Sequence, residues 1–428
     1  MIGVVADDIT GANDVGVMFT AGGYTADVYS YDLPLTFPLG RPDVVVLDTD
    51  SRLDDPATAY RKVREATRKL IDAGCTLFYK KTCSVLRGNV GPELDGMLDE
   101  LGQDFAIVAA GFPKNGRQTI GGIHYVRGVE LAKSEFRNDP VHPMRESNLV
   151  KILTAQTRRQ VDFVDHRVVS EGPEFLRQHI ERARTRCNYL VIDVVDQNSL
   201  KTIAEAVGDR YLIGGSSALG EELPSVLGPS SLGSHSLPVA PYDGTGILCA
   251  AGSLMPQTRA QVEMAVDRGA LAFELDTVRL MESDDSSFLL AKLSESIVKE
   301  MQAGRDVVVH TSSEPEAVAV TKKLGTARGL SNTAVSRLVS ESMAQVVKAC
   351  LEATGQRRFL IAGGDTSAAV CAELGIKGMR VWREIQAGVP SCYSLDGEPR
   401  LFVLKSGSFG QPDFFIQAIE HLKAPDAN

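Results

Sequence analysis

The sequence has none of the strong markers of a disulfide-linked, zinc-binding, membrane-spanning or nucleic-acid-binding protein. Its seven cysteines lie far apart without a CxxC pair, which is typical of a reduced chain with neither a disulfide framework nor a zinc cluster. It has no run of about 18 apolar residues and no recognisable secretory leader, so we expect a cytoplasmic protein without a membrane partner. The net charge of −10 argues against a nucleic-acid partner, because such partners require clustered positive charge.

Two common nucleotide-binding motifs are also missing. No GxxxxGKS or GxxxxGKT stretch occurs, which disfavours a P-loop NTPase. No GxGxxG motif follows an apolar run, which weakens the case for a dinucleotide-dependent dehydrogenase. Any phosphate site must therefore be built in another way.

The composition and periodicity are those of a globular α/β chain. At 428 residues, 43% of them hydrophobic, the chain is long enough for two domains of roughly 200 residues each. Short apolar runs alternate with amphipathic segments, which is the pattern of parallel strands covered by helices. We predict strands at residues 2–6, 44–48, 76–80, 106–110, 189–194, 247–250, 307–310, 359–362 and 401–404.

A segment rich in Gly, Pro and Ser separates the two series of strands. It reads GPSSLGSHSLPVAPYDGTG from Gly228 to Gly246 and has no periodicity. We therefore expect an α/β fold with two domains, each with a mainly parallel sheet, at residues 1–232 and 247–428. The linker is expected at residues 233–246, and the active site in a cleft between the domains.

Three strand-to-helix turns in the second half share a design based on glycine. Glycine lets the backbone approach a ligand closely, and the start of a helix offers free N–H groups to an anion. One such turn would be weak support, since every α/β protein needs glycines at these corners, but three favour a ligand site at the strand ends. The cofactor-binding residues that we expect there are Ser253, Gly363, Gly364, Asp365, Thr366, Lys405 and Gly407.

Two stretches of the first half reverse the acidic character of the chain. Residues 80–92 contain three basic residues and no acidic one, and residues 105–129 are similarly basic. We interpret Arg87 and Arg117 as a clamp for a carboxylate or phosphate, because a guanidinium binds such groups through two parallel hydrogen bonds. The first domain is therefore expected to hold a small anion.

Taken in order, eight motifs resemble those of the four-carbon acid sugar kinases and cover nearly the whole chain. They are VVADDITGAND, KKTCSVLRGNVG, GFPKNGR, NDPVHPMRES, GGSSALG, AAGSLMPQT, AGGDTS and LKSGSFG. The resemblance implies an N-terminal domain that binds a four-carbon sugar acid and a C-terminal domain that binds ATP, with phosphate transferred to the terminal 4-hydroxyl. Mg²⁺ is expected to bridge the phosphates, with ligands that the sequence does not identify, and a homo-oligomer remains open. On the substrate side, we expect Thr10, Lys80, Ser84, Arg87, Asn89 and Arg117.

The doublet Asp7 and Asp8, within DDITGAND, supplies the candidates for catalysis. Consecutive residues at a strand end point in opposite directions, so we expect the two carboxylates to have different roles. Asp8 is expected to act as base or orienter for the substrate hydroxyl, and Asp7 to hold a lysine or the helix start. The reverse assignment stays open, as does a metal-linked role for Asp365.

One departure from the family pattern bears on the substrate. Where an Asp-Ser-Thr triplet is expected in many members, this chain has Cys83-Ser84-Val85. The KKT…LRGN form resembles the threonate and erythronate kinases more than the oxo-tetronate kinases, which favours D-threonate, with D-erythronate and 3-oxo-tetronate as alternatives. A sugar-acid dehydrogenase and a non-catalytic sugar-acid-binding protein are the rival interpretations from other classes.

Overall fold

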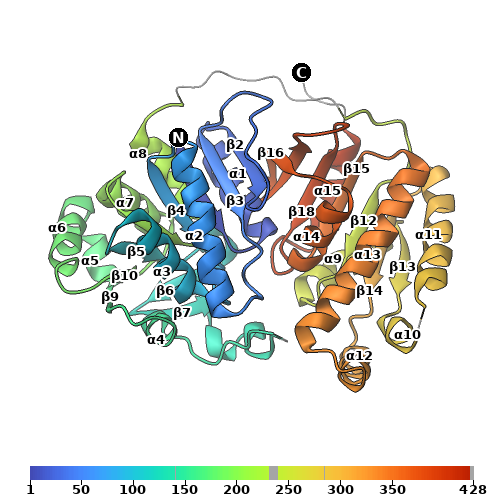
Figure 1. Ribbon diagram of the computed structural model, residues 1–428, viewed down its shortest axis with the longest axis horizontal. Coiled ribbons are helices and arrows are strands. Elements are labelled where there is room, and N and C mark those ends of the chain that lie inside the picture. The colour runs from blue at the N-terminus through green and yellow to red at the C-terminus, as the bar shows by residue number, and fades with distance from the viewer. Residues whose placement is uncertain (140, 231–239, 284, 425–428) are drawn as a thin grey trace. The chain divides into compact units, whose positions relative to one another are not determined.

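The computed structural model describes residues 1–139, 141–230, 240–283 and 285–424, which form two compact units at residues 1–235 and 236–428 (Figure 1). Each unit has a mostly parallel sheet covered by helices, so the predicted two-domain α/β class is confirmed. Residues 233–239 of the expected linker lie outside the described residues.

The main sheet of the first unit is parallel throughout. Its strands are, in spatial order, β2 (Ala26–Ser30), β3 (Val44–Asp48), β1 (Ile2–Ala6), β4 (Leu77–Lys81), β11 (Leu212–Gly215), β5 (Ala106–Ala109), β10 (Tyr189–Ile192) and β9 (Val161–Val164). A second, antiparallel sheet contains β6 (Arg117–Ile120), β7 (Ile123–Val126) and β8 (Val129–Glu130). A bridge between Thr119 and Val194 fixes this small sheet to the chain beyond β10.

Helices cover both faces of the main sheet, which explains why its central strands are continuous apolar runs rather than alternating ones. The helices are α1 (Ile9–Ala21), α2 (Pro56–Asp72), α3 (Val90–Leu101), α4 (Leu149–Thr154), α5 (His166–Ser170), α6 (Pro173–Ala183), α7 (Gln197–Val207) and α8 (Leu219–Leu227). Helix α1 packs with α8, whereas α2 packs with α3. Short 3₁₀ turns occupy Pro113–Asn115, Leu131–Lys133 and Glu135–Asn138.

The register of the first sheet aligns the ends of its central strands. Ala6 of β1 pairs with both Asp48 of β3 and Lys81 of β4, and Lys81 also pairs with Gly215 of β11. The residues that follow these strands therefore emerge at one level of the carboxyl edge, which is where ligands bind in sheets of this class.

The sheet of the second unit is parallel except for a hairpin at one end. Its strands are, in spatial order, β13 (Leu271–Leu275), β14 (Val307–Thr311), β12 (Leu248–Ala251), β15 (Arg358–Ala362), β18 (Leu401–Lys405), β17 (Val389–Ser394) and β16 (Gly378–Gln386). The helices are α9 (Pro256–Asp267), α10 (Thr277–Glu282), α11 (Ser287–Gln302), α12 (Pro315–Ala327), α13 (Asn332–Thr354), α14 (Gly364–Glu373) and α15 (Phe414–Lys423).

The helices of the second unit form two groups. Helices α9 and α15, which follow β12 and β18, pack together. Helices α12 and α14, which follow β14 and β15, both pack on α13 instead. Strands β14, β12, β15 and β18 are neighbours in the sheet. The helices that follow them therefore belong alternately to one group and the other. Crevices between strands whose connections diverge are the ligand sites of open α/β sheets.

The predicted strands agree with the observed ones to within one or two residues, and residues 2–6 and 44–48 agree at both ends. Lys80 lies inside β4, within the strand predicted at residues 76–80, and Arg117 begins a strand that was not predicted. The hairpin of β16 and β17 was missed, because its pattern carries charged residues such as Arg383 and Glu384.

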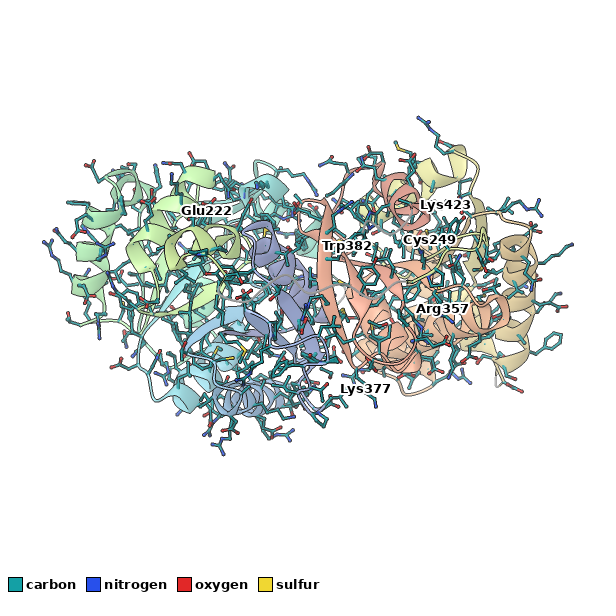
Figure 2. All side chains as sticks on the ribbon, turned by 90° about the horizontal axis from the view of Figure 1, so that it is seen from above. Glu222, Cys249, Arg357, Lys377, Trp382 and Lys423 are labelled. Atoms are coloured by element: carbon teal, nitrogen blue, oxygen red, sulfur yellow. The ribbon has the colours of Figure 1, made fainter. Side chains whose placement is uncertain are left out.

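All seven cysteines are free and buried. Figure 2 places Cys249 within the second unit, where the sulfur of this β12 residue belongs to the core. Among the described residues, no helix combines the length and apolar character needed to cross a membrane.

Candidate active site

Arg52 joins the two carboxylates of the doublet. Its Nε lies 2.7 Å from Asp7 Oδ2, and its Nη1 lies 2.6 Å from Asp8 Oδ2. Asp8 also caps α1, because its Oδ1 accepts a hydrogen bond of 2.8 Å from the backbone N–H of Gly11. Thr10 Oγ1 donates to Asp8 Oδ2 at 2.9 Å. The helix start is thus held by Asp8 and not by Asp7, contrary to the expected division of roles.

Asp7 is the more deeply buried of the pair. Burial opposes its ionisation, but Arg52, Lys80 and Lys81 outweigh burial and hold the pKa of Asp7 below its usual range. Its Oδ1 has no hydrogen-bond partner among the described residues. Asp8 keeps 11% of its side chain exposed, against 2% for Asp7, so Asp8 is the carboxylate that a ligand can reach.

Two adjacent lysines at the end of β4 each have a carboxylate partner. Lys80 Nζ lies 2.9 Å from Glu93 Oε2 in a fully buried ion pair. Lys81 Nζ lies 3.6 Å from Asp14 Oδ2, which also accepts a hydrogen bond of 2.6 Å from Ser217 Oγ. Burial raises the pKa of Asp14 to about 7 in spite of Lys81. Lys80, expected to bind substrate, is buried completely and instead anchors α3 to the sheet.

The loop after β4 carries three of the expected substrate residues. Ser84 is buried. Arg87 Nη1 pairs with Asp139, its Nε contacts Cys83 Sγ at 3.4 Å, and its guanidinium lies over the ring of Phe136 at 5.2 Å. Asn89 Nδ2 donates to the carbonyl of Ser51 at 3.0 Å. Asn89 therefore binds the neighbouring loop rather than pointing at an open site.

Arg117 is almost fully buried at the start of β6. Burial, with repulsion from Arg127, lowers the pKa of Arg117 to about 10. Its Nη1 donates to the carbonyl of Asn115, so it supports the turn before β6. The positive charge lies within electrostatic range of Arg87 and Cys83, but the side chain is not at the surface as a ligand clamp would require.

The three glycine turns of the second unit pack directly against one another. A Cβ atom on Gly407 would overlap Ser253 Oγ, and one on Gly252 would overlap Thr366 Oγ1. Gly363 has a φ of 127°, and a Cβ there would lie 3.3 Å from the backbone nitrogen of Ser253. The ends of β12, β15 and β18 thus pack tightly together, with the side chains of Ser253 and Thr366 in the space that the glycines leave. Gly364 begins α14 and adds a helix N-terminus to this corner.

Lys405 lies beneath this corner rather than in it. Its Nζ donates to Thr258 Oγ1 at 3.0 Å and to the carbonyls of Ser406 at 2.8 Å and Phe409 at 3.1 Å, with a longer contact to Gly407. Burial lowers the pKa of Lys405 to about 7. The lysine therefore shapes the Gly407 turn from inside the fold.

A hollow of about 340 Å³ adjoins the corner. It runs between α9 and strands β12, β13 and β14, and it shares Ser253 and Thr258 with the glycine turns. Apolar residues such as Val262 and Ala272 line part of it, and the carboxylates of Glu263 and Glu314 line another part. Arg259, which pairs with Glu314 at 2.8 Å, lines the hollow as well, so apolar surface is combined there with charges of both signs.

Asp365 is the exposed carboxylate at the corner, in the first turn of α14, where Ser336 Oγ donates to it at 3.1 Å. An exposed carboxylate oxygen suits Mg²⁺, which retains several waters and takes few protein ligands. A second group of possible ligands, Asp165, His166 and Asp193, lies in the first unit. There the Asp193 carboxylate already accepts bonds from the backbone N–H groups of Gly121, Gly122 and His166, so its role is structural.

Sequence reasoning missed Arg52, Asp14 and Glu93, which complete the polar network around the doublet. Arg52 lies four residues after β3, and β3 neighbours β1. Its position just after a strand end was the signal that could have placed Arg52 near the doublet. Thr258, which bridges Lys405 and the Gly407 carbonyl, follows the Pro256 that opens α9.

The sequence matches two domain families that together cover most of the chain. Residues 2–223 match the family described as sugar-binding N-terminal domain, and residues 248–415 match the family described as nucleotide-binding C-terminal domain. The chain belongs to the four-carbon acid sugar kinase family. The two domain families thus correspond to the two units of the fold.

Relatives of this family align over their full length. A 3-oxo-tetronate kinase from Haemophilus influenzae is 30% identical over 98% of this chain and 99% of its own. One from Methylobacterium radiotolerans is 32% identical over 98% of each chain. A crystal structure from Salmonella typhimurium LT2, of a protein described as a candidate tRNA synthase, has a TM-score of 0.80 at 27% identity over 97% of this chain and 98% of that one. A Haemophilus influenzae structure has a TM-score of 0.71 at 29% identity over 99% and 100%.

Proposed function

We propose that the protein transfers the γ-phosphoryl group of ATP to the 4-hydroxyl of a four-carbon sugar acid. The observation that carries this proposal is the convergence of three glycine turns at the carboxyl edge of the second unit, within a nucleotide-binding domain family. Phosphoryl transfer needs mainly alignment of the reactants and stabilisation of charge, and exposed backbone N–H groups provide both for phosphates.

The nucleotide is proposed to divide between the corner and the hollow. Its phosphates bind the turns at Ser253, Gly363 and Gly407, which pack against one another. The nucleoside occupies the hollow beside α9, whose apolar residues would face the base and whose carboxylates would accept bonds from ribose hydroxyls or a base amino group. Asp365 would hold Mg²⁺, which supplies charge neutralisation between the phosphates.

Asp8 is the proposed acceptor for the proton of the 4-hydroxyl. It is the more accessible carboxylate of the doublet, and Arg52 and Gly11 fix its orientation. A carboxylate held in one orientation suits a role in orienting the hydroxyl and taking its proton late in the transfer. Asp7 acts through Arg52 and does not itself reach the substrate.

The substrate proposed first is D-threonate, on the strength of the KKT…LRGN loop. The second candidate is 3-oxo-tetronate, which the names of the similar proteins favour. The two differ at C3, where a hydroxyl both donates and accepts a hydrogen bond and a ketone only accepts. Replacement of the expected Asp-Ser-Thr by Cys83-Ser84-Val85 changes the partners available to that position.

A coupled assay of ADP release tests the proposal with D-threonate, D-erythronate and 3-oxo-tetronate as acceptors. We expect turnover on at least one, with transfer to O4 verified by the phosphorus–proton coupling in the product. Absence of turnover on all three, with ATP and Mg²⁺ present, would refute the four-carbon acid assignment. A thermal-shift series with ATP and NAD adds a control, since stabilisation by NAD alone would favour the dehydrogenase interpretation.

A further inference from the structure

An ion pair joins two segments that flank the hollow of the second unit. Arg259, in the first turn of α9, donates from its Nη2 to Glu314 Oε1 at 2.8 Å. Glu314 directly precedes α12, in the loop that follows β14. Both residues line the hollow, as does Ser253 of the glycine corner. The pair therefore connects the start of α9 to the start of α12.

This ion pair spans a crevice between connections that diverge. Strands β12 and β14 are neighbours, with Ala251 paired to His310 at their ends. The chain after β12 enters α9, which packs with α15, whereas the chain after β14 enters α12, which packs on α13. Crevices of this kind hold ligands in open α/β sheets. Arg259 and Glu314 thus approach a ligand site from opposite sides.

Arg259 uses only part of its capacity to donate hydrogen bonds. A guanidinium has five N–H donors. Neither Nε nor Nη1 has an acceptor within hydrogen-bond distance in the part of the chain that the structure describes. Among the described residues that line the hollow, Arg259 is also the one with a permanent positive charge. Lys405, which the sequence suggested for the phosphates, is buried and directs its Nζ to oxygen atoms inside the fold.

The carboxylates of the hollow lie at different distances from this guanidinium. Glu263 and Asp267 are four and eight residues beyond Arg259 on α9, which places them about 6 and 12 Å farther along the helix axis, away from the corner. Glu314 is the carboxylate in direct contact, and it compensates the charge of Arg259 while the pair is closed. Positive charge for another anion therefore becomes available by displacement of Glu314.

Displacement of Glu314 by a phosphate is favourable. The Glu314 side chain is 70% exposed, so the carboxylate is hydrated as soon as it leaves Arg259. An exposed ion pair is weak, because water and salt screen it. A guanidinium binds a phosphate more strongly, through two parallel charge-assisted hydrogen bonds. The N-terminus of α9, which includes Arg259 in its first turn, favours the same anion.

We propose that Arg259 binds the phosphates of the nucleotide by exchanging Glu314 for a phosphate oxygen, and that Glu314 thereby lowers the affinity for the nucleotide. This inference rests on the proposed function. When the nucleotide leaves, Glu314 replaces the phosphate at Arg259, so the exchange also favours release. The ion pair is thus an internal competitor of the nucleotide.

The test measures binding without turnover, by isothermal titration of the full chain with ADP and, separately, with inorganic tripolyphosphate. Arg259→Gln is expected to raise both Kd values about tenfold or more, the range for a lost charge-assisted hydrogen bond. Glu314→Gln is expected to lower both Kd values about two- to fivefold, because the competitor for Arg259 is removed. This decrease should be smaller when Arg259→Gln is already present.

Arg357 and Glu398 supply a matched control pair, and Figure 2 labels Arg357 in the second unit. Their ion pair of 2.7 Å has side chains that are 33% and 71% exposed, against 35% and 70% for the pair across the crevice. Arg357 directly precedes β15, so it lies at the opposite edge of the sheet from the corner. Arg357→Gln and Glu398→Gln should each leave both Kd values unchanged.

The direction of the two effects separates exchange from a merely structural role. If the ion pair only held the two helices in place, Arg259→Gln and Glu314→Gln would both weaken binding, and this result would overturn the proposal. An unchanged Kd for ADP in Arg259→Gln would overturn it as well. A loss for ADP without a loss for tripolyphosphate would assign Arg259 to the nucleoside and would also overturn it.

The outcome is independent of the kinase assay. Binding of ADP that depends on Arg259, in a protein that phosphorylates none of the three tetronates, would refute the proposed function and retain this inference. Turnover together with binding that does not depend on Arg259 would retain the function and refute the inference.

Discussion

Gly407 and Ser253 are in such close contact that the glycine Cα leaves no room for a side chain. A Cβ atom on Gly407 would overlap Ser253 Oγ and lie 3.0 Å from Ser253 Cβ. The two residues come from the ends of β18 and β12, which do not pair with each other but both pair with β15. Their contact therefore closes the corner over the end of β15.

Gly407→Ala is expected to weaken binding of ATP about tenfold or more, equivalent to about 1.4 kcal/mol, because the turn must move away from Ser253. Calorimetric titration with ADP measures the loss. In a double-mutant cycle, Gly407→Ala should reduce the affinity for ADP less in the Ser253→Gly background than in the wild type. Equal costs in the two backgrounds would show that the contact does not shape the site.

Asp8→Asn should reduce kcat by about 10² or more, the range for a lost general base, while leaving the affinity for ATP nearly unchanged. Asparagine caps helices about as well as aspartate, so α1 should remain intact. Asp55→Asn, at the cap of α2, is the control for the cap itself and should retain full activity. An unchanged turnover number in Asp8→Asn would remove this carboxylate from the mechanism.

Lys405→Met is expected to lower the free energy of unfolding by about 2–4 kcal/mol, because the carbonyl groups of residues 406–409 lose a buried donor. Urea denaturation measures the change. Lys423→Met is the comparison, since Lys423 forms a partly exposed ion pair of 2.7 Å with Asp306 and should cost no more than about 1 kcal/mol. Similar losses in both variants would contradict the anchoring role of Lys405.

Asp14 should make stability depend on pH. Its folded pKa of about 7 lies above the unfolded value of 3.8, so the native state binds more protons between these values. The contribution of Asp14 to stability is therefore lost as pH rises from about 4 to 7, by up to about 1.4 kcal/mol per pH unit. Chemical denaturation across this range should show a flatter profile for Asp14→Asn than for the wild type.

Asp165 is a control whose contribution to stability changes with pH in the opposite direction. Hydrogen bonds from Arg167 lower the pKa of Asp165 to about 2, so its contribution is present above the unfolded pKa and is lost as pH falls. Asp165→Asn should therefore remove a stabilisation that grows with pH. Identical pH profiles for Asp14→Asn and the wild type would contradict the raised pKa.

The sequence was sufficient for the strands that are buried on both faces, since their apolar runs are continuous. Residues 2–6 and 44–48 are of this kind. Strand β13 was missed because it alternates between partly buried and exposed residues at the edge of its sheet. The three glycine turns could be predicted because their geometry depends on residue type, and glycine is visible in a sequence.

The charge pairings could not be predicted, because they depend on which strands are neighbours. Arg52 and Asp8 are 44 residues apart and meet only because β3 lies beside β1. The rule that consecutive side chains diverge suggested separate tasks for Asp7 and Asp8. That rule concerns the strand alone and gives no information about Arg52 on a neighbouring loop. The guanidinium of Arg52 contacts both carboxylates through two of its nitrogen atoms.

The loop at residues 82–89 is fastened at its two ends by bonds to main-chain atoms. The N–H of Thr82 donates to the carbonyl of Gly215 at 2.7 Å, and Asn89 Nδ2 donates to the carbonyls of Ser51 and Asp54 at 3.0 and 2.8 Å. These bonds are independent of the side chains at residues 83–86. Side-chain changes at these four positions therefore leave intact the bonds that fasten the loop, and the strands that carry the doublet keep this support.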